Sequence, residues 1–226
     1  MSENIRVAID GPSGAGKSTL ARSVAARLNF LYVDTGAIYR TIGYAVWRKG
    51  IDPRDRSAVV AVLPDLEICL TYGTDGLQHM ELNGMDVTAE IRLPEVSRYA
   101  SLVSAYPEVR AYLLEMQRQL ARENSVVMDG RDIGTVVLPD ATVKIFLTAS
   151  PEARATRRWK EYQAKGIDTP YEEVLADVKQ RDYQDTHRAA APLKQAEDAV
   201  LLDTSELDFE QSLDAMKQII AKKIGG

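Results

Sequence analysis

The sequence predicts an α/β fold in which a five-stranded parallel sheet is flanked by helices. Five short aliphatic runs carry this prediction, and none of them alternates apolar with polar residues, which is typical of strands buried on both faces. The runs are Arg6–Asp10, Phe30–Asp34, Ser125–Asp129, Val143–Leu147 and Ala199–Asp203. Helical apolar spacing occurs between them, most clearly over Ser18–Leu28, Pro107–Glu123 and Asp208–Ile224. Strands that alternate with helices indicate right-handed crossovers and a parallel sheet.

Composition limits the class of protein. The chain has 226 residues, 45% of them hydrophobic, which predicts one large globular domain or one domain with insertions. Its 33 acidic and 28 basic residues give a net charge of −5, which argues against a nucleic-acid partner. The single cysteine excludes an intramolecular disulfide and a cysteine zinc site. The N-terminus has no apolar signal core and no apolar run reaches the roughly 18 residues of a membrane span, so we expect a cytoplasmic protein without a membrane partner.

Two segments interrupt the α/β rhythm. Asp65–Ile91 alternates apolar residues from Leu66 to Tyr72 and contains the tight-turn pair Asn83-Gly84, which predicts an inserted β-hairpin or three-stranded sheet. Residues 150–188 predict two helices. The first begins at the cap Ser150 and stops at Gly166, and the second begins at Thr169, with capping-box spacing to Glu172. A hinge near 166–168 is how a mobile lid is built.

Residues 11–18, GPSGAGKS, match the phosphate-loop pattern G-x-x-x-x-G-K-[ST] between a predicted strand and a predicted helix. The glycines let backbone amides converge on an anion, and the helix N-terminus adds partial positive charge. Lys17 is expected to reach the β- and γ-phosphates, and the Ser18 hydroxyl is expected to bind Mg²⁺. The residues predicted to bind ATP here are Gly11, Pro12, Ser13, Gly14, Ala15, Gly16, Lys17, Ser18 and Thr19.

Asp129 ends a buried strand and is a candidate for the magnesium shell, although a turn or helix-cap aspartate is the alternative. Arg131 and Asp132 follow it on a loop at the sheet edge where open α/β sheets bind ligands. Two predicted helices carry basic residues on one face, which suits either phosphate neutralisation or solvated ion pairs. These faces are formed by Arg154, Arg157 and Arg158, and by Arg181, Asp185 and Arg188.

Two further pairs carry weaker signals when each is taken alone. Thr35 is placed to cap a helix that carries Arg40, and a plain helix cap is the alternative. Ser101 and Arg110 flank Pro107, which puts a hydroxyl and a guanidinium near a corner between helices.

Four motifs in order resemble the bacterial cytidylate kinases, which are nucleoside monophosphate kinases, and the similarity covers almost the whole chain. They are GPSGAGKS at 11–18, DTGAIYR at 34–40, DGRDIGTVV at 129–137 and RDYQDTHRAAAP at 181–192. The resemblance implies a P-loop NTPase core formed by 1–34, 97–149 and 171–226. It also implies a monophosphate-binding domain with the β-rich insert at 35–96, and a lid at 150–170. The implied reaction is phosphoryl transfer from MgATP to CMP or dCMP, with Mg²⁺ as cofactor, by a monomer.

The resemblance also implies roles for single residues. Ser101, Arg110 and Asp132 would read the cytosine edge, and Arg181 and Asp185 would hold the sugar. Thr35, Arg40, Arg131 and Arg188 would lie at the acceptor phosphate, and Arg154, Arg157 and Arg158 would reach ATP from the lid. Lys17, Asp129, Arg131 and Arg188 would form the catalytic group.

Other functions remain open on the sequence. A kinase acting on another monophosphate is the nearest alternative. A shikimate-type enzyme is disfavoured because Asp34-Thr35-Gly36 stands where that class carries D-x-D. A GTPase switch would need an N-K-x-D motif, which the sequence lacks. A regulatory ATPase or a pure nucleotide-binding module would also carry the phosphate loop.

Overall fold

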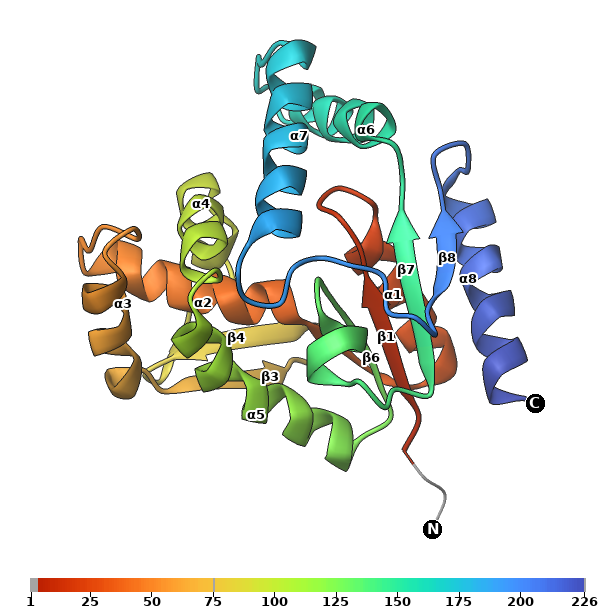
Figure 1. The fold of residues 1–226 in the computed structure, drawn as a ribbon, viewed down its shortest axis with the longest axis horizontal. Helices are drawn as coiled ribbons and strands as arrows, with labels where there is room; N and C mark the ends of the chain where they lie inside the picture. Colours follow the sequence, from red (N-terminus) through yellow and green to blue (C-terminus); the bar gives the residue numbers. More distant parts are fainter. Residues whose placement is uncertain (1–3, 75, 226) are drawn as a thin grey trace. The chain divides into compact units, whose positions relative to one another are not determined.

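The computed structural model describes residues 4–74 and 76–225, and the chain divides into two compact units (Figure 1). Unit 1 comprises the described residues up to Tyr32 and those from Ala121 on, and unit 2 comprises Val33–Leu120. The chain passes between the units within strand β2 and within helix α5. The division into core, insert and lid stays a prediction; unit 2 combines the expected insert with residues 97–120.

Unit 1 is built on a parallel sheet in the strand order β2-β6-β1-β7-β8, which confirms the predicted fold class. Its strands and helices are β1 (Arg6–Asp10), α1 (Lys17–Leu28), β2 (Leu31–Asp34), β6 (Val126–Gly130), β7 (Val143–Thr148), α6 (Pro151–Ala164), α7 (Tyr171–His187), β8 (Val200–Asp203) and α8 (Phe209–Ile224). A π-helical turn, Ile133–Val137, follows β6. Strand β6 is buried throughout, while the edge strand β8 is partly exposed.

The core of unit 1 lies between the sheet and two helices. Val7 and Ile9 of β1 and Leu147 of β7 are fully buried, and they join one apolar cluster with Val24 of α1 and Met216 of α8. Val7 and Ile9 face this cluster, and Ala8 and Met128, which are not part of it, are also buried, so the central strands read as continuous aliphatic runs. Buried strands of this kind bring their carboxyl ends to one edge of the sheet, where the loops carry the polar residues.

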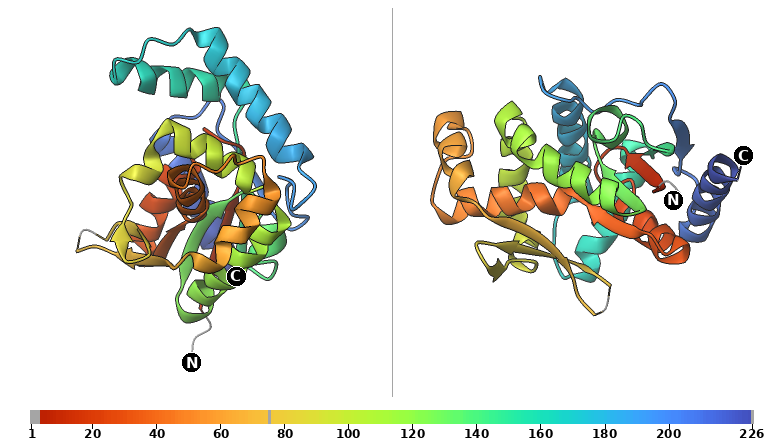
Figure 2. Two further views of the ribbon diagram at one scale, coloured as in Figure 1. Left: turned by 90° about the vertical axis from the view of Figure 1, so that its left-hand side faces the viewer. Right: turned by 90° about the horizontal axis from the view of Figure 1, so that it is seen from below.

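Helices α6 and α7 follow β7 and form a pair beyond the carboxyl ends of the strands (Figures 1 and 2). Ser150 caps α6 by accepting a hydrogen bond from the Ala153 N–H at 3.1 Å, and Gly166 adopts a φ of 69° after its end, as predicted. The predicted capping box at Thr169 is wrong. Pro170 occupies the N-cap position and makes no side-chain cap, so α7 begins at Tyr171 and Thr169 lies one residue too early to cap it.

Unit 2 combines helices with a small antiparallel sheet in the strand order β3-β4-β5 (Figure 2). Its elements are α2 (Thr35–Arg48), α3 (Arg56–Val62), β3 (Ile68–Tyr72), β4 (Gln78–Leu82), β5 (Met85–Asp86), α4 (Pro94–Val103) and α5 (Pro107–Glu123), with single 3₁₀ turns at Leu63–Asp65 and Glu90–Arg92. Asn83 and Gly84 both have positive φ at the β4–β5 turn, so the predicted inserted sheet and its Asn-Gly turn are confirmed.

The cap of α2 differs from the prediction by one residue. Asp34, with an extended backbone, accepts a hydrogen bond from the Ala37 N–H at 2.9 Å and is the N-cap. Thr35 is instead the first residue of the helix and is buried. None of the helices in the described part of the chain is both long enough and apolar enough to cross a lipid bilayer.

We predict that Gly43→Ala lowers the free energy of unfolding of the protein by about 1–3 kcal/mol, the usual cost of overpacking. A Cβ at Gly43 of α2 would lie 2.7 Å from the backbone nitrogen of Ala100 in α4, which cannot move independently of its helix. Urea denaturation measures the change. An exposed helical glycine gains about 1 kcal/mol on the same substitution, so a gain in stability would contradict the close helix packing.

Candidate functional site: a phosphate loop ringed by paired charges

The phosphate loop leaves β1 at Gly11 and ends where α1 begins at Lys17. Gly11 has a φ of 152°, and a Cβ there would lie 1.9 Å from the Leu147 carbonyl oxygen of β7, so only glycine fits. Gly16 precedes α1 in the left-handed conformation, with a φ of 89° and no side-chain cap. The first backbone amides of α1 are therefore directed into the loop, which is the arrangement that binds phosphate.

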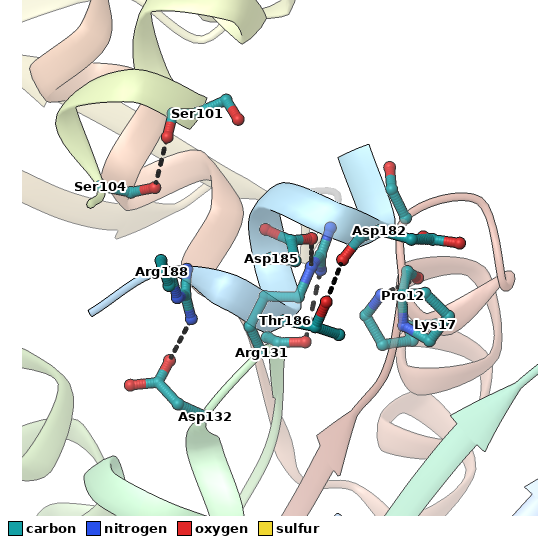
Figure 3. A network of polar contacts seen from close by, with 12 residues as sticks. Pro12, Lys17, Ser101, Ser104, Arg131, Asp132, Asp182, Asp185, Thr186 and Arg188 are labelled. Carbon is teal, nitrogen blue, oxygen red and sulfur yellow. Dashed lines mark hydrogen bonds and ion pairs between the residues drawn. The ribbon is translucent and has the colours of Figure 1, made fainter. Parts of the chain in front are cut away.

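The Lys17 ammonium group is buried within unit 1 and donates a hydrogen bond to the Pro12 carbonyl oxygen at 2.7 Å (Figure 3). Burial, followed by repulsion from Arg131, lowers the pKa of Lys17 to about 7, and attraction to Asp129, Asp185 and Asp10 opposes this shift. A bound phosphate would add negative charge beside the ammonium and raise the pKa again. Lys17 is thus held where an anionic ligand would stabilise its charged form.

Asp129, at the end of β6, lies against the start of α1. Its carboxylate accepts one hydrogen bond from the Ser18 hydroxyl at 3.0 Å and another from the Tyr32 hydroxyl at 2.8 Å. The Asp129 side chain is almost fully buried, and both of these hydrogen-bond donors are hydroxyl groups. Hydroxyl and carboxylate oxygens are the donors that Mg²⁺ prefers.

The loop after β6 forms two ion pairs in the same region of unit 1, one with helix α7 and one with the C-cap residue of that helix (Figure 3). The Arg131 Nε donates to the Asp185 carboxylate at 2.7 Å, and the Arg188 guanidinium lies 3.8 Å from the Asp132 carboxylate. Burial tends to raise the pKa of Asp185, but Arg131, Arg188 and Arg181 outweigh it and hold that pKa below its ordinary value. The structure therefore brings Asp185 of α7 and Arg188, the C-cap residue of that helix, to the loop that carries Arg131 and Asp132, while Arg181 lies one helical turn before Asp185.

The three predicted lid arginines of α6 have different surroundings. Arg154 is only 3% exposed, and its guanidinium donates to the carbonyl oxygens of Ala149 and Ser13 at 2.8 and 3.1 Å and to both oxygens of Asp182 at 2.8 and 2.6 Å. Arg157 donates to the carbonyl and hydroxyl oxygens of Thr204. The Arg158 guanidinium lies over the Tyr162 ring, and its Nε donates to the Tyr162 hydroxyl at 3.1 Å.

In unit 2, Arg40 is fixed at the start of α2. Its Nη2 donates to the Asp34 carboxylate at 2.9 Å, and the Asp34 backbone is held in turn by Gln78 of β4 through hydrogen bonds of 2.7 and 3.2 Å. The inserted sheet thus supports the helix end that carries Thr35 and Arg40.

Ser101 and Arg110 meet at the corner between α4 and α5 through a third residue, Ser104. The Ser104 hydroxyl donates to the Ser101 carbonyl oxygen at 3.0 Å, and the Arg110 Nη1 donates to the Ser104 carbonyl oxygen at 3.0 Å. The Arg110 guanidinium also lies 5.2 Å from the centre of the Tyr39 ring. These bonds link the Ser101 and Ser104 backbones to Arg110, while the expected approach of the Ser101 hydroxyl to the guanidinium stays a prediction.

Sequence reasoning missed the carboxylates that hold these groups in place. Asp182 pairs with Arg154, Asp34 pairs with Arg40, and Asp10 accepts two backbone N–H groups of the loop after β6. Asp10 and Asp34 share one signal with Asp129, since each ends an aliphatic run. Asp182 carries no local signal, because its partner lies 28 positions earlier.

A parallel sheet whose first strand enters a glycine-rich phosphate loop and a helix N-terminus defines a P-loop nucleotide-binding protein. A family model described as cytidylate kinase matches residues 7–222. The chain belongs to the cytidylate kinase family.

Individual relatives agree with this membership. A cytidylate kinase of Desulfitobacterium hafniense is 48% identical over 224 residues, covering 99% of this chain and 96% of the relative. One from Carboxydothermus hydrogenoformans is 48% identical, covering 97% and 98%. A solved structure of an uncharacterized protein from Eubacterium ventriosum covers 99% of both chains with a TM-score of 0.52 and 14% identity, and it supports the fold alone.

We predict that Asp182→Asn lowers the free energy of unfolding by about 3 kcal/mol, because it leaves the buried Arg154 guanidinium without its counter-charge. Urea denaturation measures the loss. The matched control is Glu152→Gln, which removes the exposed Glu152–Lys179 pair between the same two helices. An exposed pair contributes about 0–1 kcal/mol. Equally small losses of unfolding free energy in the two variants would show that the Arg154–Asp182 pair does not stabilise the protein more than the exposed pair does.

Proposed function

We propose that the protein transfers the γ-phosphoryl group of ATP to CMP and dCMP, giving ADP and CDP or dCDP. The observation that carries the proposal is the phosphate loop of unit 1, with Arg131 near Lys17 and Arg188 paired with the neighbouring Asp132. Two polyanions must approach each other in this reaction, and clustered cations offset their repulsion. Membership of the cytidylate kinase family supports the choice of cytosine nucleotides.

The donor phosphates are assigned to the loop and the start of α1. The amides of residues 11–18 would cradle the β-phosphate, and Lys17 would leave the Pro12 carbonyl to contact β- and γ-oxygens. Thr19 follows Ser18 in the first turn of α1, at the positive end of its dipole. Each well-placed donor in such a site contributes roughly 3–4 kcal/mol to transition-state stabilisation.

Magnesium fits the donor set at the base of the loop. The Ser18 hydroxyl would bind the ion, and Asp129 would hold its shell from the position where it now accepts the Ser18 hydrogen bond. The described residues contain no cluster of three or more His, Cys, Asp or Glu side chains suited to a metal. This agrees with an ion that takes its other ligands from phosphates and water, as Mg²⁺ does. When bound, Mg²⁺ neutralises phosphate charge and orients the γ-phosphoryl group.

The acceptor phosphate and sugar are assigned to the charged residues described above and to two of their neighbours in the sequence motifs. In unit 1, Arg131 and Arg188 would contact the phosphate, while Arg181 and Asp185 would hold the sugar hydroxyls. In unit 2, Thr35 and Arg40 would contact the phosphate of the acceptor. The attacking atom is a phosphate oxygen that is already anionic, so the reaction needs alignment rather than a strong general base.

The cytosine edge is assigned to Asp132 in unit 1 and to Ser101 and Arg110 in unit 2. A carboxylate accepts a hydrogen bond from the cytosine amino group, whereas the corresponding uracil oxygen would be repelled. The role of Arg110 is supported by its fixed orientation, since Ser104 and Tyr39 hold the guanidinium.

The lid arginines are assigned separately. Arg157 and Arg158 would reach ATP in a closed form of the lid that excludes water. Arg154 is assigned to the same nucleotide site because its guanidinium donates to the Ser13 carbonyl of the phosphate loop. The guanidinium also donates to Asp182, so its N–H groups are already engaged. We further propose that the protein acts in the cytoplasm as a monomer on small nucleotides.

An acceptor panel tests the proposed function. ADP formation from MgATP is measured with CMP, dCMP, UMP, AMP, GMP, dTMP or shikimate, each supplied alone, beside a reaction without acceptor. We expect turnover with CMP and dCMP and little with the others. Rapid ADP release without acceptor would indicate an ATPase, and preference for another acceptor would refute the cytosine assignment.

We predict that Asp132→Ala lowers the ratio of kcat/KM for CMP to that for UMP by about 10–100-fold, the value of one hydrogen bond to a charged group. Steady-state kinetics with both acceptors measure the ratio. Asp140→Ala serves as the control, because its exposed carboxylate pairs with Arg6 outside the proposed site. An unchanged ratio in Asp132→Ala would count against base recognition by this carboxylate.

A further inference from the structure

Asp10 is the last residue of β1 and directly precedes the phosphate loop. Its side chain is only 4% exposed. One carboxylate oxygen accepts a hydrogen bond from the Ile133 N–H and the other from the Gly134 N–H, each at 2.7 Å. A buried carboxylate therefore joins the strand that leads into the donor loop to the turn that follows β6.

The connection extends the sheet beyond its last backbone pair. The parallel ladder between β1 and β6 ends at the pair Asp10–Gly130, after which the two chains separate. Without the Asp10 carboxylate, the Ile133 and Gly134 N–H groups would make no hydrogen bond to β1. The Asp10 side chain thus continues the link for three or four residues after the ladder has ended.

Both ends of this link adjoin residues that the proposed function uses. On one side, Gly11 follows Asp10 and packs without space for a Cβ on the Leu147 carbonyl, so the backbone at the start of the loop is fixed. On the other side, Arg131 and Asp132 directly precede Ile133. Their side chains contact Asp185 and Arg188.

Burying this carboxylate is unfavourable, which indicates that the hydrogen bonds accepted by its two oxygens are structurally important. Burial raises the pKa of Asp10 to about 6, and the Gly134 and Ile133 N–H groups and Lys17 limit the rise while Asp132 adds to it. An asparagine would occupy nearly the same volume without a buried charge. It would offer only one acceptor oxygen, however, and would set an NH₂ group against the other backbone N–H.

We propose that Asp10 is a positioning residue for phosphoryl transfer, which fixes Arg131 and Asp132 relative to the phosphate loop by holding the Ile133 and Gly134 N–H groups. This inference rests on the proposed function. Asp10 contacts backbone rather than nucleotide in this assignment. Its loss should therefore misalign acceptor and donor while the loop that binds ATP keeps its own geometry.

The test is Asp10→Asn, examined by rapid-quench single turnover with saturating MgATP and CMP. We expect the transfer rate to fall by about 10–100-fold, the effect of a misplacement of about 1 Å. The dissociation constant of a non-hydrolysable ATP analogue should stay within about twofold of the wild-type value, since that interaction is made by the phosphate loop. Circular dichroism and thermal unfolding verify that the variant is folded.

Asp208→Asn is the matched control, because its carboxylate also accepts a backbone N–H, from Gln211 at 2.9 Å, at the exposed start of α8. It should change neither the transfer rate nor the affinity for the analogue. A second variant, Gly134→Ala, adds a methyl group beside the same link with the carboxylate intact. Its Cβ would lie 3.4 Å from Asp10 Oδ2 and 3.2 Å from Lys144 Cδ, so we expect a smaller loss of the same kind.

The outcomes separate this inference from the proposed function. Wild-type protein that forms no ADP with CMP refutes the proposed function and, with it, a role for Asp10 in that transfer. Wild-type transfer that Asp10→Asn matches refutes the positioning role alone. An equal loss of analogue affinity in Asp10→Asn would also overturn it, because the residue would then support the whole loop. If Asp10→Asn does not fold, Gly134→Ala decides by the same two measurements.

Discussion

The site in unit 1 depends on one electrostatic constraint: cations gathered for a polyanionic ligand must be held together when no ligand is bound. Arg131 is paired with Asp185, Arg188 lies near Asp132, and the Lys17 ammonium donates to a backbone carbonyl. Each pairing lowers the repulsion between like charges in a region of low dielectric. The same pairing orients the cations toward one edge of the sheet. A bound phosphate would then take the place of the carboxylate or carbonyl oxygen that each cation now contacts, with little rearrangement.

Helices α6 and α7 are also joined by a charge pair, with a different consequence. Arg154 joins α6 to α7 through Asp182 and to the phosphate loop through the Ser13 carbonyl. The Arg154 guanidinium thus holds the two helices and the loop together, whereas Arg157 contacts Thr204 and Arg158 contacts Tyr162 of its own helix. In unit 2, Gln78 of the inserted sheet bonds to Asp34, which in turn bonds to Arg40. The inserted sheet therefore holds the start of α2 in position.

The sequence predicted those parts of the structure that depend on local patterns. The bounds of β1 and α5, the phosphate loop and the Asn-Gly turn all follow from neighbouring residues and were confirmed. The caps of α2 and α7 were misplaced by one residue, because Asp34 and Thr35, or Thr169 and Pro170, are alternatives that only backbone conformation separates. Ion-pair partners were not predictable, since Arg131 and Asp185 lie 54 positions apart. The roles assigned to individual nucleotide contacts stay predictions.

The most direct measurement is a crystal structure of the protein with a bisubstrate analogue in which adenosine and cytidine are joined by a chain of phosphates. The account predicts that the phosphates lie on the amides of residues 11–18, and that Lys17 has left the Pro12 carbonyl to contact them. It also predicts that Arg131 and Arg188 donate to phosphate oxygens. Phosphates bound away from the loop, with Lys17 still on Pro12 and both arginines still on their carboxylates, would contradict the account.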